Sequence, residues 1–171
     1  MSAVNSLEKS LGDVFKNAPK LPSGGKKALV QYLPWINLGL GALMLWLAYD
    51  LYDKAHAVGK LYDYANSLYK AIGGTEIGKN RLTVLVWAAV ALLAVQGVLY
   101  IAAFPGTRDR KKAGWNFMFY ASLVNVIYGV VILFSDYGDV GTLLLSLVGS
   151  AVGLYLLFQI RDSYSGSNKA S

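Results

Sequence analysis

Four long apolar stretches occupy most of this 171-residue chain and limit what it can fold into. They run from about Tyr32 to Leu51, Leu82 to Phe104, Ala113 to Phe134 and Val140 to Ile160. Each stretch is about as long as the roughly 20 residues that an α-helix needs to cross a bilayer. Lipid cannot hydrogen-bond to backbone amides, so each crossing segment must be helical. The sequence therefore predicts an all-α integral membrane protein, a bundle of four transmembrane helices.

Little of the chain is left for a soluble domain, because 55% of the residues are hydrophobic and only 15% are charged. We expect one four-span bundle over residues 31–161, preceded by an arm and linker over residues 1–30 and followed by a tail over residues 162–171. The first span, and not a cleaved signal peptide, is expected to direct insertion. The absence of cysteine excludes disulfides, thiolate metal sites and a cysteine nucleophile.

The distribution of lysine and arginine predicts how the protein lies in the membrane, because basic residues near membrane spans are retained on the cytoplasmic side. Eleven of them fall on one side, in the N-terminal arm, the loop between spans two and three, and the tail, whereas five fall in the long loop on the other side. Both termini are therefore expected to be cytoplasmic. The net charge of +6 then reflects topology and attraction to anionic headgroups, and nucleic acid is not an expected partner.

The N-terminal arm has the periodicity of an amphipathic helix. Its apolar residues recur at helical spacing, which predicts a short helix lying on the cytoplasmic leaflet. These residues are Val4, Leu7, Leu11, Val14 and Phe15. The stretch rich in proline and glycine that follows, Pro19–Lys27, is expected to be a linker.

A second amphipathic segment, over about residues 52–72, predicts an outer helix between spans one and two. The helix either extends span one beyond the membrane or bends near Gly59 and lies on the membrane surface. Its apolar stripe is expected to cover the bundle or the lipid surface, with a partner helix as the alternative. Gly73 and Gly74 are expected to end the helix. The stripe consists of Leu51, Ala55, Val58, Tyr62, Ala65, Tyr69 and Ile72.

Few polar side chains lie inside the predicted spans. Asn37, Gln96 and Asn125 are amides in spans one, two and three, and a hydrogen-bonded cluster of the three is expected to hold the bundle in register. The alternative is that Gln96 and Asn125 line a polar path through an oligomeric passive channel or carrier. None of the three can titrate, which argues against proton-coupled transport. Asp50, in the outer turn of span one, is the only acidic residue within a span.

Small residues in the last span predict a close helix contact. They are Ser146, Gly149, Ser150 and Gly153. The spacing of Gly149 and Gly153 forms a small-xxx-small motif, which lets two helices approach closely. We expect the motif to pack within the bundle, and a homodimer is the alternative.

The loop between spans two and three is a basic hairpin that contains Arg108, Arg110, Lys111 and Lys112. Its leading interpretation is that of a topology determinant, because loop lysines and arginines set orientation. The alternative is a binding site for anionic phospholipid headgroups.

The sequence contains no recognisable catalytic or metal-binding constellation. His56 is the sole histidine, so a histidine cluster cannot hold a metal within one chain. Neither a nucleophile-elbow motif nor a metalloprotease motif is present. We therefore expect neither an enzyme nor a bound cofactor.

The last third of the chain carries a set of loop and anchor motifs. They are Phe104-Pro105-Gly106, the basic run after it, Gly114-Trp115-Asn116 with Phe119-Tyr120, and Leu156-Leu157-Phe158-Gln159-Ile160-Arg161. In these motifs the chain resembles small, uncharacterised four-span proteins of bacteria. The resemblance implies a protein of the bacterial cytoplasmic membrane and implies no activity.

Features for packing and anchoring outnumber features for chemistry in this sequence. It therefore predicts a small, non-catalytic integral membrane protein that acts through lipid contact, or through helix packing with itself or with another membrane protein. Its expected partners are membrane lipids, anionic lipids included.

Overall fold

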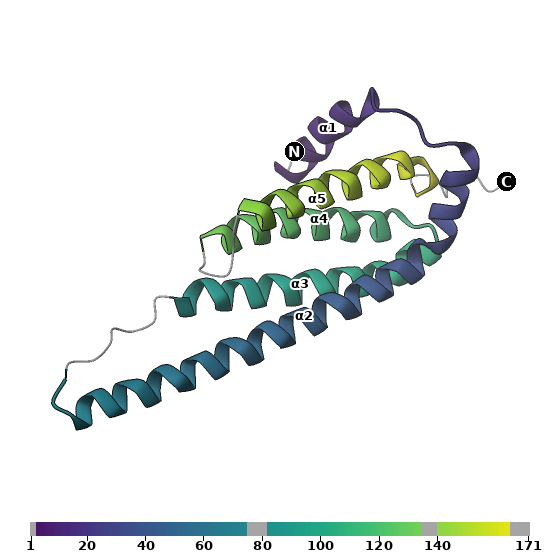
Figure 1. Cartoon of the computed structure of the whole chain (residues 1–171). Helices are drawn as coiled ribbons and strands as arrows, with labels where there is room; N and C mark the ends of the chain where they lie inside the picture. The colour runs from purple at the N-terminus through teal and green to yellow at the C-terminus, as the bar shows by residue number, and fades with distance from the viewer. Residues whose placement is uncertain (1–2, 75–81, 135–139, 165–171) are drawn as a thin grey trace.

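A computed structural model describes residues 3–74, 82–134 and 140–164, and these residues are helical throughout apart from short turns and one linker. Figure 1 shows the five α-helices and the 3₁₀ helix that follows them. The elements are α1 (Ala3–Lys16), α2 (Ser23–Ala71), α3 (Leu82–Arg108), α4 (Lys112–Leu133), α5 (Val140–Gln159) and η1 (Arg161–Ser163). The predicted all-α fold class is confirmed, because the described residues contain no strand. Most of the predicted tail lies outside the described residues.

Three helices are long and apolar enough to cross a bilayer. They are α2, Val84–Arg108 within α3 and Lys112–Val131 within α4. In α5 the apolar stretch is the shorter Leu143–Gln159. The molecule thus has the helices of an integral membrane protein, and three of the four predicted spans have the length and composition of a crossing.

The helices form a row in which sequence neighbours lie side by side. Figure 1 shows the order α1, α5, α4, α3, α2, with α2 to α5 alternating in direction. The start of α2, the end of α3, the start of α4 and the end of α5 lie together at one end of the helix axes. We call this end the basic end, because the basic hairpin and the lysines that precede α2 gather there.

Helix α2 settles how the outer helix is connected to span one. It is continuous over 49 residues, which corresponds to about 73 Å and is more than twice the thickness of the hydrocarbon core. The outer helix therefore extends span one, and the chain stays helical through Gly59. Figure 1 shows that the last turns of α2 extend past the start of α3, and most of residues 58–71 are exposed. We call this segment the distal arm.

Glycine ends α2 as the sequence predicts. Gly73 has a φ of +77°, a left-handed conformation that costs glycine little and that commonly follows a helix. The Gly73 N–H donates to the carbonyl of Lys70 at 3.1 Å, and the Gly74 N–H donates to the carbonyl of Tyr69 at 2.8 Å. The last carbonyl groups of the helix are satisfied in this way.

The linker before α2 is shorter than the Pro19–Lys27 stretch expected from the sequence, because α2 already begins at Ser23. Pro22 has a φ of −54° and a ψ of 148°, and its carbonyl accepts the Lys26 N–H at 3.0 Å. Gly24 and Gly25 lie in the first turn of α2. The glycines thus belong to the helix start and not to the linker.

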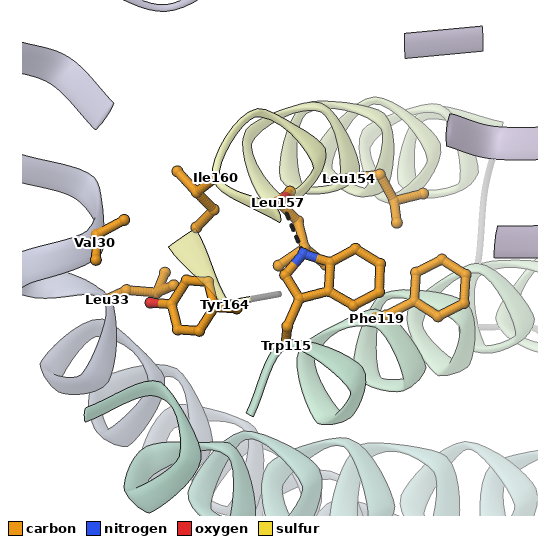
Figure 2. Packing of buried hydrophobic residues seen from close by; sticks show 8 residues of the cluster. All are labelled: Val30, Leu33, Trp115, Phe119, Leu154, Leu157, Ile160 and Tyr164. Atoms are coloured by element: carbon orange, nitrogen blue, oxygen red, sulfur yellow. Dashed lines mark hydrogen bonds between the residues drawn. The ribbon is translucent and has the colours of Figure 1, made fainter. Parts of the chain in front are cut away.

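A core of aromatic and aliphatic side chains closes the basic end. In Figure 2, Trp115 and Phe119 of α4 face Leu154 and Leu157 of α5, and the Trp115 indole N–H donates to the carbonyl of Leu157 at 2.9 Å. This carbonyl lies in the last turn of α5, where intrahelical partners run out. The cluster also contains Val30, Leu33, Ile160 and Tyr164. Tyr164, in the stretch predicted to be tail, is only 2% exposed.

Candidate functional site

One face of α1 packs against the last turns of α5. Phe15 stacks on Phe158 with ring centroids 5.6 Å apart, and Glu8 forms an ion pair with Arg161. At Gly12, a Cβ atom would lie 3.4 Å from the Phe158 ring, so the small residue permits this close approach. The sequence predicted the helix correctly, but it predicted a contact with the leaflet and not this contact with α5.

Two residues of the α1 apolar stripe, Leu7 and Val14, point away from α5. Leu7 is 41% exposed and Val14 is 69% exposed. The two residues lie two helical turns apart and share one face of α1. The stripe is therefore divided between residues that pack on α5 and residues that point away from the protein.

The linker after α1 is tied to α5 by hydrogen bonds to its backbone. The Tyr155 hydroxyl donates to the carbonyl of Pro19 at 2.5 Å, and the Gln159 side-chain amide donates to the same carbonyl at 3.2 Å. The Leu21 N–H in turn donates to the Gln159 side-chain oxygen at 3.3 Å. These bonds hold the linker, and the lysines on either side of it, beside the end of α5.

A cavity of about 570 Å³ lies between α1, the linker and the end of α5. We call it the basic cavity, because six cationic side chains and three carboxylates line it, an excess of three positive charges. The cations are Lys9, Lys16, Lys20, Lys26, Lys112 and Arg161, and the carboxylates are Glu8, Asp13 and Asp162. Asn5, Gly12, Phe15, Phe158 and Gln159 complete its lining.

Arg161 differs from the other cations of the basic cavity. It pairs with Glu8, and its guanidinium lies 5.5 Å from the centroid of the Trp115 ring. Among the described residues, none of the five lysines of the cavity forms an ion pair. The positive charge of the cavity thus comes mainly from lysines that form no ion pair within the described part of the chain.

A smaller cavity of about 150 Å³ adjoins the basic cavity and shares Lys112, Arg161 and Asp162 with it. Its remaining lining residues are Trp115 and Tyr164. Burial raises the pKa of Tyr164 to about 12, although the nearby Arg110 opposes this shift. Tyr164 is therefore a neutral phenol at neutral pH and does not offset the positive charge next to it.

The four basic residues of the predicted hairpin lie in three different environments. Only Lys112 faces the basic cavity. Arg108 and Arg110 line a separate cavity of about 210 Å³ against Trp35 and other residues of α2. Lys111 pairs with Asp109 at 2.9 Å, and the hydrogen bond and charge of Lys111 lower the pKa of that carboxyl. The four side chains of the hairpin therefore do not share one cavity, and their contact with lipid headgroups stays a prediction.

The three intramembrane amides do not form the expected cluster. The Asn37 side-chain amide donates to the Thr107 hydroxyl at 3.3 Å, whereas that of Asn125 donates to the Ser150 hydroxyl at 2.7 Å. Gln96 is 2% exposed, and its side-chain oxygen has no hydrogen-bond partner among the described residues.

The amides do not meet because they lie at different levels along their helices. Gln96 and Thr107 are eleven residues apart on α3, which places them about 16 Å apart along the helix axis. Asn37 lies at the level of Thr107 and so cannot reach Gln96. Asn37 and Asn125 each hydrogen-bond to one neighbouring helix, in two separate pairs. None of the three amides lines any of the three cavities described above.

The small residues of α5 face two directions. The Ser146 hydroxyl lies so close to Gly129 of α4 that a Cβ atom there would clash with it at 2.0 Å, and Ser150 is buried against Asn125. Gly149 and Gly153, in contrast, have no atom within 4 Å of a built Cβ position. The serines therefore pack within the molecule, whereas the two glycines of the small-xxx-small motif lie on its outer face.

The outer acid Asp50 pairs with Lys54 one turn further along α2, at 2.6 Å. An exposed pair of this kind contributes little to stability. His56 stacks on Tyr52 with ring centroids 5.9 Å apart. Within the described parts of the chain, no three histidine or acidic side chains lie close enough together to hold a metal ion.

Comparison with protein-family models, with curated proteins and with solved structures finds no match to this chain. The resemblance to small bacterial four-span proteins stays a prediction.

Sequence reasoning did not bring together Lys16, Lys20 and Lys26 around one cavity. A signal was present in α1, where Glu8, Gly12 and Phe15 share one helical face. A small residue on such a face permits close approach of another helix, so it would have pointed to a helix contact but not to α5 as the partner.

Proposed function

We propose that this protein is a non-catalytic integral membrane protein that acts through contact with membrane lipids, and that its basic end lies among anionic headgroups. The observation that carries the proposal is the basic cavity, whose five lysines have no ion-pair partner among the described residues. Lysines close to a membrane surface are attracted to anionic lipids, each by about 1 kcal/mol.

The exposed residues of α1 support the same placement. Leu7 and Val14 form an apolar edge next to a cationic cavity. A helix with an apolar edge and a basic side is suited to the boundary between headgroups and acyl chains. In this placement Leu7 and Val14 contact acyl chains while the lysines remain at headgroup level.

We further propose four crossings, with both termini on the cytoplasmic side of a bacterial membrane. Helix α5 has 20 residues, which corresponds to about 30 Å and matches the hydrocarbon core. Four crossings place the start of α2 and the end of α5 on the same side of the membrane. This agrees with the position of both at the basic end. The excess of basic residues at that end favours the cytoplasm.

Native mass spectrometry of the full chain released from lipid nanodiscs tests the proposal. Nanodiscs of phosphatidylcholine mixed with phosphatidylglycerol are the probe. We expect the protein to retain phosphatidylglycerol well above its share of the nanodisc lipids. Retention in proportion to nanodisc composition would contradict lipid binding, and turnover of a substrate by the purified protein would contradict a non-catalytic role.

A further inference from the structure

We infer that the basic cavity binds a phosphate group with two negative charges, a phosphomonoester, carried by a lipid headgroup or by a soluble organic phosphate. For the lipid source the inference rests on the proposed function, and it adds the chemical class of the ligand. The argument uses the charge of the cavity, the directions from which its cations come, and its size.

The charge of the cavity favours a doubly charged ligand. Six cations and three carboxylates leave an excess of three positive charges. A phosphodiester carries one negative charge, whereas a phosphomonoester carries about −1.5 to −2 at pH 7. The phosphomonoester therefore neutralises more of the excess positive charge.

The cations reach the cavity from separate parts of the chain. Lys16 comes from α1, Lys20 from the linker and Lys26 from the first turn of α2, while Lys112 begins α4 and Arg161 follows α5. A phosphomonoester has three terminal oxygens, each able to accept hydrogen bonds. It can thus be contacted from several sides at once, which suits ammonium groups that act as point charges.

Hydrogen bonds fix the backbone beside the cavity. The bonds from Tyr155 and Gln159 to the carbonyl of Pro19 fix the linker between Lys16 and Lys20. Preorganisation of this kind lowers the cost of binding. The volume of about 570 Å³ lies within the range of about 300–1,000 Å³ found for small-molecule sites.

Lipid nanodiscs that contain phosphatidic acid, a phosphomonoester lipid, provide the first arm of the test. They are compared with phosphatidylglycerol nanodiscs of the same total negative charge, and retained lipid is counted by native mass spectrometry of the full chain. We expect phosphatidic acid to be retained at least about fivefold more strongly. In the double variant Lys16→Gln/Lys20→Gln, its affinity should fall about 30-fold, because two cationic contacts are lost.

Lys111→Gln is the matched control, because Lys111 lies next to Lys112 but pairs with Asp109 and does not line the cavity. The control removes one positive charge from the same end of the molecule, half of the charge that each double variant removes. Its retention of phosphatidic acid should stay within about twofold of the wild type, because exposed charges outside the cavity are screened. A second double variant, Lys26→Gln/Lys112→Gln, tests the two cavity lysines that come from α2 and α4.

Titration of the detergent-solubilised full chain with glycerol phosphate, followed by calorimetry, is the second arm and separates a soluble ligand from a lipid. Binding that both double variants lose and Lys111→Gln keeps would support the inference with a soluble source. Equal retention of the two lipids by every variant, without glycerol phosphate binding, would overturn it while the proposed lipid contact stands. If the protein retains no anionic lipid but binds glycerol phosphate through the cavity lysines, the proposed function fails and the inference holds.

Discussion

Arg161 connects the features of the basic end at the scale of a single residue. Its guanidinium pairs with Glu8 of α1, lies over the Trp115 ring of α4 and lines both adjoining cavities. A planar, permanently charged group can satisfy an acid and an aromatic face together, which a lysine does less well. Arg161 thus helps to hold α1 on α5 and adds its charge to the basic cavity.

Tyr164 leads to a prediction about alkaline pH. Its pKa is raised from the ordinary 10 to about 12 by burial, so folding favours the neutral phenol. This contribution to the free energy of unfolding is complete below pH 10 and is lost as the pH rises from 10 through 12. By linkage, the loss amounts to about 2 kcal/mol at pH 12. Tyr164→Phe has no proton to lose, so it should become more stable than the wild type above pH 10.

The check is thermal unfolding of both proteins in detergent across that pH range. Near pH 7 the variant should unfold at or slightly above the wild-type temperature, because the Tyr164 hydroxyl has no hydrogen-bond partner among the described residues. Removing such a group relieves a desolvation cost. Parallel pH curves for the two proteins would show that this phenol does not titrate differently on folding.

At the scale of elements, the hairpin between α3 and α4 depends on two glycines that face each other. A Cβ atom on Gly114 would lie 2.3 Å from the backbone nitrogen of Thr107 and 2.4 Å from the carbonyl carbon of Gly106. Backbone atoms cannot move aside as a flexible side chain can. Gly114→Ala should therefore lower the free energy of unfolding by about 1–3 kcal/mol or more.

Gly149→Ala is the control for this prediction, because a Cβ atom there meets nothing within 4 Å. Alanine favours the helix over glycine by up to about 1 kcal/mol, so the control should unfold at or above the wild-type temperature. Helix content followed by circular dichroism during heating measures both variants. Equal stability of Gly114→Ala and the wild type would mean that α3 and α4 are farther apart at the hairpin than described.

The helices themselves could be predicted from the sequence, because apolar stretches and amphipathic stripes are local properties. Their partners could not. The α1 stripe fits a leaflet as well as it fits α5, and the heptad-like stripe after Leu51 fits a bent helix as well as a straight one. The choice depends on contacts such as Phe15 with Phe158, which join residues 143 positions apart.

At the scale of the whole molecule, the row of helices explains why the predicted amide cluster is absent. In a closed bundle, helices that are distant in sequence can meet along the centre. In this row each long helix packs mainly on its sequence neighbours, so Asn37 meets α3 and Asn125 meets α5. The level of each amide along its helix then decides which residue of the neighbouring helix it meets.

The two ends of the helices differ in charge and shape, which leads to a prediction about orientation in the membrane. The basic end carries the cavity, whereas the distal arm extends from the other end with Leu61, Tyr64 and Tyr69 exposed. If the basic end is cytoplasmic, the distal arm lies on the outer side of the membrane. The sequence contains no cysteine, so a single introduced thiol reports its own location without background.

Asn17→Cys in the linker and Ser67→Cys in the distal arm place one thiol on each side, since both positions are exposed. A thiol reagent that cannot cross membranes is applied to bacterial spheroplasts that express the protein. We expect it to label Ser67→Cys in intact spheroplasts and Asn17→Cys only after permeabilisation, because lysines and arginines near spans stay in the cytoplasm. The reverse labelling would invert the proposed orientation and place the basic cavity outside. Labelling of both positions in intact spheroplasts would contradict a continuous crossing by α2, because the two thiols lie on either side of its first apolar stretch.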